Sequence, residues 1–255
     1  MSATHGNGVQ TAQPPQAKGL GSASHRFGPP VDCRRILVVG AGGFGREVLQ
    51  WARDAWPDHA ARIAGFLSAD DRALDGFDTY PPIVSTPDAY VAAAGDKLLL
   101  GIGVPYARRK VAESLLARGA EFLTLVHPTA IVAASATIED GAILCPYAIA
   151  SDSCRVGRFV IMNYHTSLGH DASAGDFSVL SPYATLGGNA HVAEDVFLGL
   201  HASVGPGKTV GARSKVSANS CVLSSAPGDS IVFGVPGKIC RRVSMDMTFR
   251  GGTDS

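Results

Sequence analysis

The feature that most constrains this chain is a repeat of six residues that runs without insertion or deletion from Val126 to Val222. Every sixth residue in this stretch is apolar. The series is Val126, Val132, Ile138, Leu144, Ala150, Val156, Met162, Leu168, Ala174, Leu180, Leu186, Val192, Leu198, Val204, Val210, Val216 and Val222. Neither the 3.6-residue period of an α-helix nor the two-residue alternation of a β-strand gives this spacing, whereas a hexapeptide-repeat β-helix does.

The repeat also has a small residue four places after each apolar one. Ala130 and Ala136 begin this second series, and Lys208 is its one large member. Each hexad then supplies a short strand and a tight corner, and three hexads close an 18-residue coil of a triangular prism. The apolar residue points into the prism and stacks on its equivalent one coil away. Glycines at the same spacing, such as Gly169 and Gly187, agree with this coil length.

Composition and charge limit the classes of function. The chain has 45% hydrophobic and 17% charged residues and a formal net charge of zero, and no basic stripe is interleaved with aromatic residues. Nucleic acid is therefore not expected as the main partner. No stretch approaches 18 consecutive apolar residues, and the N-terminus lacks the apolar core of a signal peptide. We therefore expect no membrane segment.

The cysteines indicate the compartment. The chain has five of them, and they form neither a CxxC pair nor a zinc-type spacing. An odd number of scattered thiols is typical of a reducing environment rather than of a secreted disulfide framework. We therefore predict a cytoplasmic protein without a metal site.

Changes in composition divide the chain into four segments. Residues 1–33 are rich in Gly, Ser, Ala, Pro and Gln and poor in large apolar groups, which predicts a disordered tail. Residues 34–125 carry the patterns of an α/β Rossmann-like unit that binds a nucleotide or nucleotide sugar. Residues 126–227 are predicted to form the β-helix, an all-β domain. Residues 228–255 are interpreted as a cap over the open end of the prism, followed by a tail.

The Rossmann-like unit opens with a glycine turn, Gly40–Gly45, between a buried strand and a helix. Its predicted elements are strands at 36–39, 62–67 and 122–126 and helices at 46–55 and 107–118, with a further apolar segment at 97–101. At such a turn, glycines let backbone N–H groups and the positive helix end approach a phosphate, which points to Gly42 and Gly43. Roughly 90 residues hold little more than one mononucleotide half, so a nucleotide or nucleotide sugar, NAD and a purely structural turn all stay open.

A histidine with a carboxylate neighbour is the strongest candidate for chemistry. His170 is followed by Asp171, and the position one coil later is Gly188, which leaves space beside the imidazole. The position one coil earlier is Asp152, about 4.8 Å away between backbones. A carboxylate beside an imidazole fixes its tautomer and makes it a better base. Whether Asp171 or Asp152 orients the ring stays open, as does the alternative of an ordinary surface pair.

Two other sets of residues have weaker claims. His165, Tyr183 and His201 are 18 residues apart, so the prism stacks them in one column, interpreted as an aromatic ladder or part of a ligand groove. Cys154 occupies an inward position, where a thiol packs and stays protonated. Covalent catalysis by a cysteine is therefore a minor alternative.

Several motifs together resemble a known family. They are GAGGFGREV, LLLGIG followed by YARRK, LVHPTA at the entry to the hexapeptides, GHD within them, and FGVPGK after them. Over about residues 34–242 the chain resembles the sialic acid O-acetyltransferase and nucleotide-amino-sugar N-acetyltransferase family. The resemblance implies a left-handed parallel β-helix, a homotrimer, an active site between neighbouring subunits, and acetyl-CoA along the outside of the prism.

The resemblance also assigns roles to individual positions. His170 matches the general base and Asp171 the acidic residue that tunes it. The positions that match substrate contacts are Gly42, Gly43, Phe44, Ser68 and Gly103, and those that match acyl-CoA contacts are Val179, Leu200 and Ala218. At two of them the chain departs from some members, which carry an Asp pair where this chain has Ser68 and Ala69, and a second histidine where it has Val179.

We therefore predict an acyl-CoA-dependent acyltransferase, foremost an acetyltransferase acting on a nucleotide-linked amino sugar for surface-glycan biosynthesis. Acetyl-CoA, or another acyl-CoA, would be a co-substrate, with no permanently bound cofactor. Three alternatives are O-transfer to sialic acid or another non-nucleotide sugar, an NAD-dependent oxidoreductase, and a non-catalytic trimeric binding protein.

Overall fold

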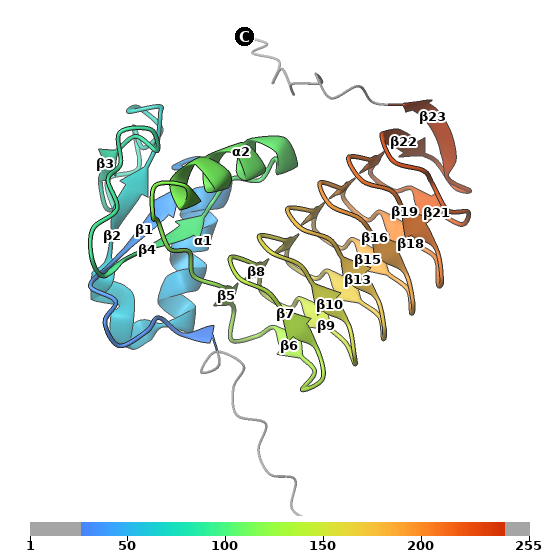
Figure 1. The fold of residues 1–255 in the computed structure, drawn as a ribbon, viewed down its shortest axis with the longest axis horizontal. Helices are drawn as coiled ribbons and strands as arrows, with labels where there is room; N and C mark the ends of the chain where they lie inside the picture. The colour runs from blue at the N-terminus through green and yellow to red at the C-terminus, as the bar shows by residue number, and fades with distance from the viewer. Residues whose placement is uncertain (1–26, 243–255) are drawn as a thin grey trace, which may run out of the picture.

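The computed structural model describes residues 27–242, which form an α/β domain followed by a β-prism (Figure 1). Both parts of the predicted fold class are confirmed, including the left-handed parallel β-helix. The two parts share a continuous core, because apolar residues of the α/β domain and of the prism belong to the same buried cluster. In residues 27–242, no helix is both long and apolar enough to span a membrane.

The α/β domain contains a four-stranded parallel sheet in the order β3-β2-β1-β4. Its strands are β1 (Arg35–Val39), β2 (Ile63–Leu67), β3 (Ile83–Ser85) and β4 (Asp96–Leu100). Its helices are α1 (Gly43–Ala55), the short 3-10 helix η2 (Pro57–Arg62) and α2 (Pro105–Leu116). The predicted β1, β2, α1 and α2 are present within three residues, and the apolar segment at 97–101 forms most of β4, whereas β3 and η2 were not predicted.

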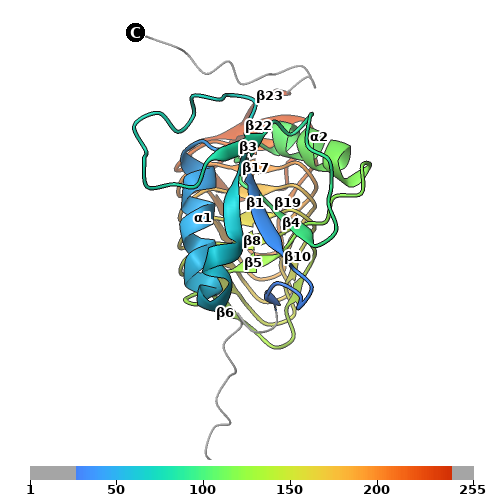
Figure 2. The ribbon, with the colours of Figure 1, turned by 90° about the vertical axis from the view of Figure 1, so that its left-hand side faces the viewer.

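The two helices lie on opposite sides of this sheet (Figure 2). One face of α1 is buried through Val48, Leu49 and Ala52, in a cluster that also holds residues of β1 and of the prism. Helix α2 buries Ala112 and Leu115 against the other side of the sheet. Helix α1 therefore joins the sheet to the prism.

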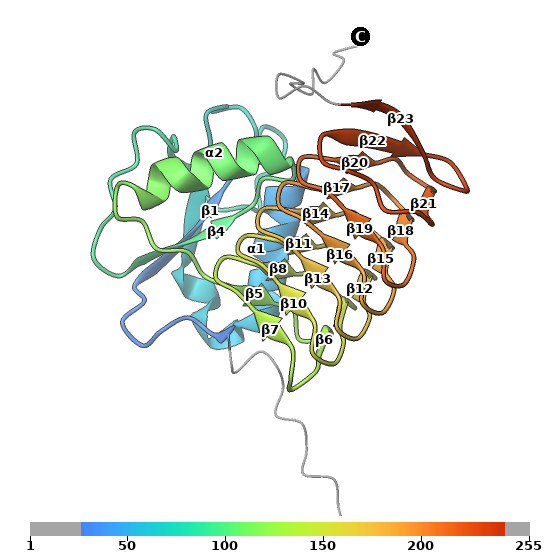
Figure 3. The ribbon, with the colours of Figure 1, turned by 45° about the vertical axis from the view of Figure 1, so that its right-hand side comes forward.

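The prism consists of two-residue strands, apart from the longer β22 and β23 at its end, that follow one another around three faces (Figure 3). Face 1 contains β5 (Leu125–Val126), β8 (Ile143–Leu144), β11 (Ile161–Met162), β14 (Val179–Leu180), β17 (Phe197–Leu198), β20 (Lys215–Val216), β22 (Ser230–Phe233) and β23 (Lys238–Arg242). Face 2 contains β6 (Ile131–Val132), β9 (Ile149–Ala150), β12 (Ser167–Leu168), β15 (Thr185–Leu186), β18 (Ser203–Val204) and β21 (Cys221–Val222). Face 3 contains β7 (Thr137–Ile138), β10 (Arg155–Val156), β13 (Ser173–Ala174), β16 (His191–Val192) and β19 (Thr209–Val210).

The register of these strands has the 18-residue coil that the repeat predicts. Leu168 pairs with Ala150 on one side and with Leu186 on the other, all in parallel. The sixth-position series fills the interior, where Leu168, Leu180 and Leu198 are fully buried. Close packing of these side chains, coil on coil, stabilises a stack of strands too short to be stable alone.

Both ends of the prism differ from the predicted boundaries. β22 extends face 1 in parallel beyond residue 227, and β23 returns antiparallel to it, so the cap is a hairpin joined to the sheet. At the other end, Phe27 packs against the prism core and Cys33 is buried, so residues 27–33 belong to the fold rather than to a disordered tail. The rest of the predicted tail, residues 1–26, lies outside the described residues, as do residues 243–255.

Candidate active site

His170 and Asp171 lie at the corner of the prism between face 2 and face 3, where β12 leads into β13. The His170 Nδ1 atom is 2.8 Å from Asp171 Oδ2, and both side chains are more than half exposed. Asp171 has a φ of 59°, in the left-handed region that the corner requires and that Asp tolerates better than most residues. The corner thus presents an imidazole whose Nδ1 is held by a carboxylate and whose Nε2 is available for a proton.

The other carboxylate left open by the sequence, Asp152, does not contact the imidazole. Its oxygens accept hydrogen bonds from the hydroxyls of Ser135 and Ser153. Asp171 is therefore the residue that is placed to fix the tautomer of His170.

Gly188, one coil further along, lies directly against the imidazole. A Cβ atom at this position would be 2.4 Å from His170 Nε2, so only glycine fits beside the ring as it is placed. The Gly188 N–H has no hydrogen-bond acceptor among residues 27–242, whereas the Gly187 N–H donates to the Val204 carbonyl at 2.9 Å. An unused backbone donor beside an unused imidazole nitrogen suits a reaction that needs a base and a stabilised oxyanion.

A second candidate region lies in the α/β domain at the carboxyl ends of β1 and β4. These strands are neighbours whose following helices lie on opposite sides of the sheet, an arrangement that forms a ligand crevice in open α/β sheets. A Cβ atom at Gly42, Gly43 or Gly103 would meet no atom within 4 Å, so the predicted glycines border open space. The first turn of α1 carries no acidic side chain that would oppose a phosphate there.

The other predicted substrate residues in this domain have local partners. The Phe44 ring is half-buried and packs edge-on against Trp51 with ring centroids 5.9 Å apart. The Ser68 side chain is buried, and its hydroxyl donates to the Asp70 carbonyl at 2.8 Å and accepts from the Asp70 N–H at 3.2 Å. Ser68 thus stabilises the loop after β2 with a hydroxyl that is already in use.

Arg46 is a residue of this region that the sequence analysis missed. Its guanidinium lies 3.9 Å from the centre of the Phe77 ring, and Nη1 donates to the Ala41 carbonyl at 3.3 Å. This places a cation in the first turn of α1, next to the glycine turn. Its position inside the motif GAGGFGREV was a signal that Arg46 belongs to this site. Its contact with Phe77 could not be predicted, because Phe77 lies 31 residues further along the chain.

The predicted acyl-CoA residues are separated by the fold. Leu200 and Ala218 are exposed on successive coils at the corner between face 1 and face 2, and the Asn219 N–H donates to the Leu200 carbonyl at 2.8 Å. Val179 is instead 4% exposed on face 1, in the cluster shared with the α/β domain. Side-chain contact between Val179 and an acyl-CoA is therefore not supported by this packing, while Leu200 and Ala218 remain accessible.

The aromatic column predicted from the 18-residue spacing is present at the same corner as Leu200. Tyr147 extends it by one coil, so that Tyr147, His165, Tyr183 and His201 stack with centroid separations of 5.0, 4.8 and 4.7 Å. The rings are within 10° of parallel. The column is a ladder along the outside of the prism, and its exposed rim borders the predicted acyl-CoA positions.

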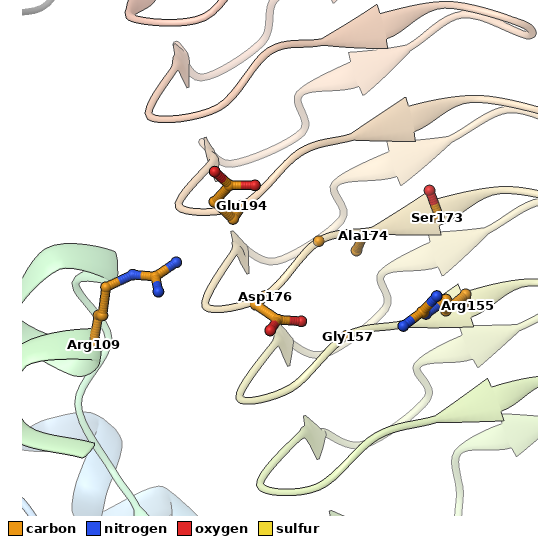
Figure 4. A pocket seen from close by; sticks show the side chains of 8 residues that line it. Arg109, Arg155, Gly157, Ser173, Ala174, Asp176 and Glu194 are labelled. Atoms are coloured by element: carbon orange, nitrogen blue, oxygen red, sulfur yellow. The ribbon is translucent and has the colours of Figure 1, made fainter. Parts of the chain in front are cut away.

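A cavity of about 430 Å³ lies between α2 and face 3 (Figure 4). Arg109, Arg155, Asp176 and Glu194 contribute charges of both signs to its lining, and Ser173 comes from the same coil as His170. Arg109 is already paired with Asp195 and Glu113. Since its charges balance, this cavity has no clear preference for an anionic ligand.

The cysteine alternative loses support in the structure. Burial raises the pKa of the Cys154 thiol to about 11 and raises that of Cys145 well above its ordinary value. Both thiols are therefore protonated at neutral pH and are poor nucleophiles.

The two candidate regions lie on opposite sides of the prism. The α/β domain packs on face 1 through Leu125, Ile143 and Ile161. The corner with His170 joins face 2 to face 3, and in a triangular prism that corner is opposite face 1. One chain therefore cannot bring its own glycine turn to its own His170 without leaving this fold.

Comparison with known proteins gives consistent results. Residues 35–115 match the family model of the PglD N-terminal domain. Over 148 residues the chain is 27% identical to a GDP-perosamine N-acetyltransferase of Escherichia coli O157:H7. The aligned part is 54% of this chain and 63% of that relative.

Solved structures extend the likeness across the described fold. PerB from Caulobacter crescentus, solved in complex with CoA and GDP-perosamine, is 26% identical with a TM-score of 0.71, covering 80% of this chain and 96% of PerB. The acetyltransferase domain of PglB from Neisseria gonorrhoeae FA1090 is 26% identical with a TM-score of 0.73, covering 81% of this chain and 99% of that domain. The same domain has also been solved with acetyl coenzyme A. A PglD-type N-terminal domain, a hexapeptide β-helix and these relatives confirm the predicted resemblance to the nucleotide-amino-sugar N-acetyltransferase family.

Proposed function

We propose that this protein transfers an acetyl group from acetyl-CoA to the amino group of a nucleotide-linked amino sugar. The observation that carries the proposal is the His170–Asp171 pair on the outer corner of the prism, beside a Gly188 N–H that has no acceptor in the described part of the chain. The relatives support the chemistry, since PerB was solved with CoA and GDP-perosamine and the PglB domain with acetyl coenzyme A.

The proposed mechanism is direct transfer. The neutral amine attacks the thioester carbonyl, and its proton passes to Nε2 of His170, while Asp171 holds the Nδ1 proton. The C–S bond then breaks, and the thiolate leaves and is protonated to CoA. A positioned general base of this kind supplies about 10²–10⁴-fold.

The Gly188 N–H is proposed to donate to the developing oxyanion. Removal of one such donor in other acyl-transfer enzymes costs about 10²–10³-fold. Because an alanine methyl would collide with His170 Nε2, the same glycine provides both the donor and the space for the attacking amine.

The proposed site is shared between two chains. The crevice beside Gly42, Gly43 and Gly103 holds the nucleotide, and His170 is on the far side of the same prism. A neighbouring copy in a cyclic homotrimer brings its His170 corner to the crevice of the first, with acetyl-CoA along the exposed Leu200 and Ala218 corner. A cytoplasmic location remains a prediction that rests on the free thiols.

The test is an assay of thiol release from acetyl-CoA with a panel of nucleotide-linked amino sugars, free sugars and sialic acid. We expect transfer to a nucleotide-linked amine and a loss of at least about 10²-fold in kcat for His170→Ala. The matched control is Asp152→Ala, one coil away at the same corner and out of contact with the ring. Near-normal turnover by His170→Ala would overturn the mechanism, and transfer only to a hydroxyl would change the assignment to O-acetylation.

A further inference from the structure

Arg108 in α2 is the largest fully buried side chain of the described fold, with 0% of its surface exposed. Its Nε donates to the Phe159 carbonyl at 2.8 Å, and Nη1 donates to the carbonyls of Leu100 and Ile102 at 2.6 and 2.7 Å. The Nη2 atom is buried and has no hydrogen-bond partner among residues 27–242. No carboxylate in that range forms an ion pair with Arg108. The α/β domain therefore contains a cation without a counter-ion.

Packing does not explain this choice of residue. Burial of a charge is unfavourable unless the charge is paired, and replacement of buried ionic groups by apolar groups of similar volume is often neutral or stabilising. The neighbouring cations of the same domain follow the rule, since Arg35 pairs with Asp96 and Lys97 pairs with Glu121. Arg108 is different, which indicates that its counter-charge does not come from residues 27–242.

The hydrogen bonds of Arg108 place its charge beside the nucleotide crevice. Leu100 and Ile102 flank Gly101, at the carboxyl end of β4. The Gly101 N–H donates to the Val39 carbonyl at 2.8 Å, and a Cβ atom on Gly101 would be 2.8 Å from the Gly45 Cα, so the loop after β4 touches the glycine turn after β1. The guanidinium therefore lies on the buried side of the loop after β4, and this loop borders the crevice through Gly103.

We propose that Arg108 is a buried counter-charge for the diphosphate of the nucleotide-linked substrate, and that it also holds the loop after β4 in place. The proposal rests on the proposed function, because it assigns the ligand of the same crevice. Arg108 does not touch the ligand. It is a positioning residue that acts through the carbonyls of Leu100 and Ile102 and through the field of its charge.

The expected size of the effect follows from electrostatics. Two unit charges on the order of 10 Å apart, at an effective permittivity of about 20, interact strongly enough to change a dissociation constant by roughly tenfold. Burial lowers the pKa of Arg108 to about 9, so the guanidinium is charged at neutral pH. Because the charge is buried, salt screens it less than it screens a surface cation.

The first test separates charge from hydrogen bonding at position 108. Arg108→Lys keeps the charge, and Arg108→Gln keeps amide donors without the charge. With UDP and GDP as probes in titration calorimetry on the intact protein, we expect Arg108→Gln to weaken binding by roughly tenfold or more. Because Arg108→Lys keeps the charge, its affinity should stay within about threefold of wild type. The affinity for CoA should be unchanged in both variants.

The second test leaves Arg108 in place and neutralises its charge from a neighbour. Cys145 is fully buried and near enough to the guanidinium that a negative charge on its side chain would raise the pKa of Arg108. Cys145→Asp should supply a counter-ion and weaken UDP and GDP binding, whereas its neutral match Cys145→Asn should not. This arm remains informative if Arg108→Gln fails to fold.

Wild-type affinity in Arg108→Gln, or equal weakening in the Lys and Gln variants, overturns the proposal of a counter-charge. So does equal binding by Cys145→Asp and Cys145→Asn. Acetyl transfer is measured separately, which distinguishes the two proposals. If the wild type transfers acetyl to a nucleotide-linked sugar with a KM that Arg108→Gln does not change, the proposed function stands and this inference fails. If nucleotide affinity depends on Arg108 but no acetyl transfer occurs, the Arg108 proposal stands and the proposed function fails.

Discussion

Gly188 touches the imidazole of His170 from the next coil of the prism, and a methyl group added to Gly188 would be 2.4 Å from Nε2. This contact joins two residues 18 apart in the sequence. It places a backbone N–H and a ring nitrogen, both without a hydrogen-bond partner among residues 27–242, side by side at the solvent-exposed corner. The corner is therefore defined by the stacking of coils as much as by the residues Gly169-His170-Asp171.

The first prediction concerns this contact. Gly188→Ala should lower kcat by about 10²-fold or more, because the methyl group displaces the base and crowds the oxyanion donor. The melting temperature should change little, since residue 188 is on the surface and has an ordinary backbone conformation. Acetyl transfer at saturating substrates and thermal unfolding of the same preparation check both parts. An active Gly188→Ala variant would show that the ring leaves this position during catalysis.

The second prediction separates the two carboxylates near the base. Asp171→Asn should lower kcat by about 10²-fold or more, because an amide at this position can hold the wrong tautomer of His170. Asp152→Asn should retain most of the activity, because Asp152 bonds Ser135 and Ser153 instead. Steady-state kinetics of the two variants decides the matter, and the opposite order of activities would mean that Asp152 moves to the ring in the assembled enzyme.

The third prediction follows from the opposite placement of the crevice and the base. A His170→Ala chain and a chain with a blocked crevice, such as Gly43→Trp, should each be inactive and should regain activity when co-expressed. In a mixed cyclic trimer about a third of the sites would be restored, since each site needs one intact partner of each kind in the right order. Differently tagged chains purified in tandem give the mixed trimers. Failure to regain activity would contradict a site shared between chains.

The fourth prediction concerns stability and pH. Burial tends to raise the pKa of the Asp96 carboxyl, but hydrogen bonds from Arg35 and Tyr90 outweigh it and leave the pKa lowered. A lowered pKa in the folded state contributes stability above the unfolded value of about 3.9, and this contribution is lost as pH falls through the folded value. Asp96→Asn should therefore destabilise the protein by about 2 kcal/mol at neutral pH.

The dependence of stability on the ionisation of Asp96 also determines how the effect of Asp96→Asn varies with pH. The difference in stability from wild type should be constant between about pH 7 and pH 5 and should shrink below about pH 4. Denaturant unfolding over this range measures it. Asp96 is at the amino end of β4, away from the crevice, so nucleotide affinity is the internal control. A penalty that grew on acidification would contradict the sign of this argument.

The prism could be predicted from the sequence because the same six-residue pattern is repeated in every coil. Each inward residue, such as Leu168 or Leu180, repeats a position already occupied in neighbouring coils, so one register satisfies the whole series. The His170 and Gly188 juxtaposition followed from that register alone. The choice between Asp171 and Asp152 did not, because it depends on side-chain rotamers and on hydroxyl partners that the period does not specify.

Contacts between the two domains were harder to predict. The outward residues Leu125, Ile143 and Ile161 are apolar at 18-residue intervals, which was an available signal that face 1 is covered. Arg108 gave no such signal, since an arginine next to Arg109 in a helix usually faces solvent. Its burial is set by three carbonyls, and one of them belongs to Phe159, 51 residues away.

The stacking of coils also has a consequence for dimensions. Because the strands of a coil pair only with those of the coils before and after it, a coil of 18 residues that does not contact the α/β domain is a unit that can be removed or added. Deletion of residues 207–224 would bring the terminal hairpin closer to His170 by one strand spacing, about 4.8 Å. The length of the exposed corner that carries Leu200 and Ala218 is therefore adjustable in steps of this size, and so is the length of a ligand that could lie along it.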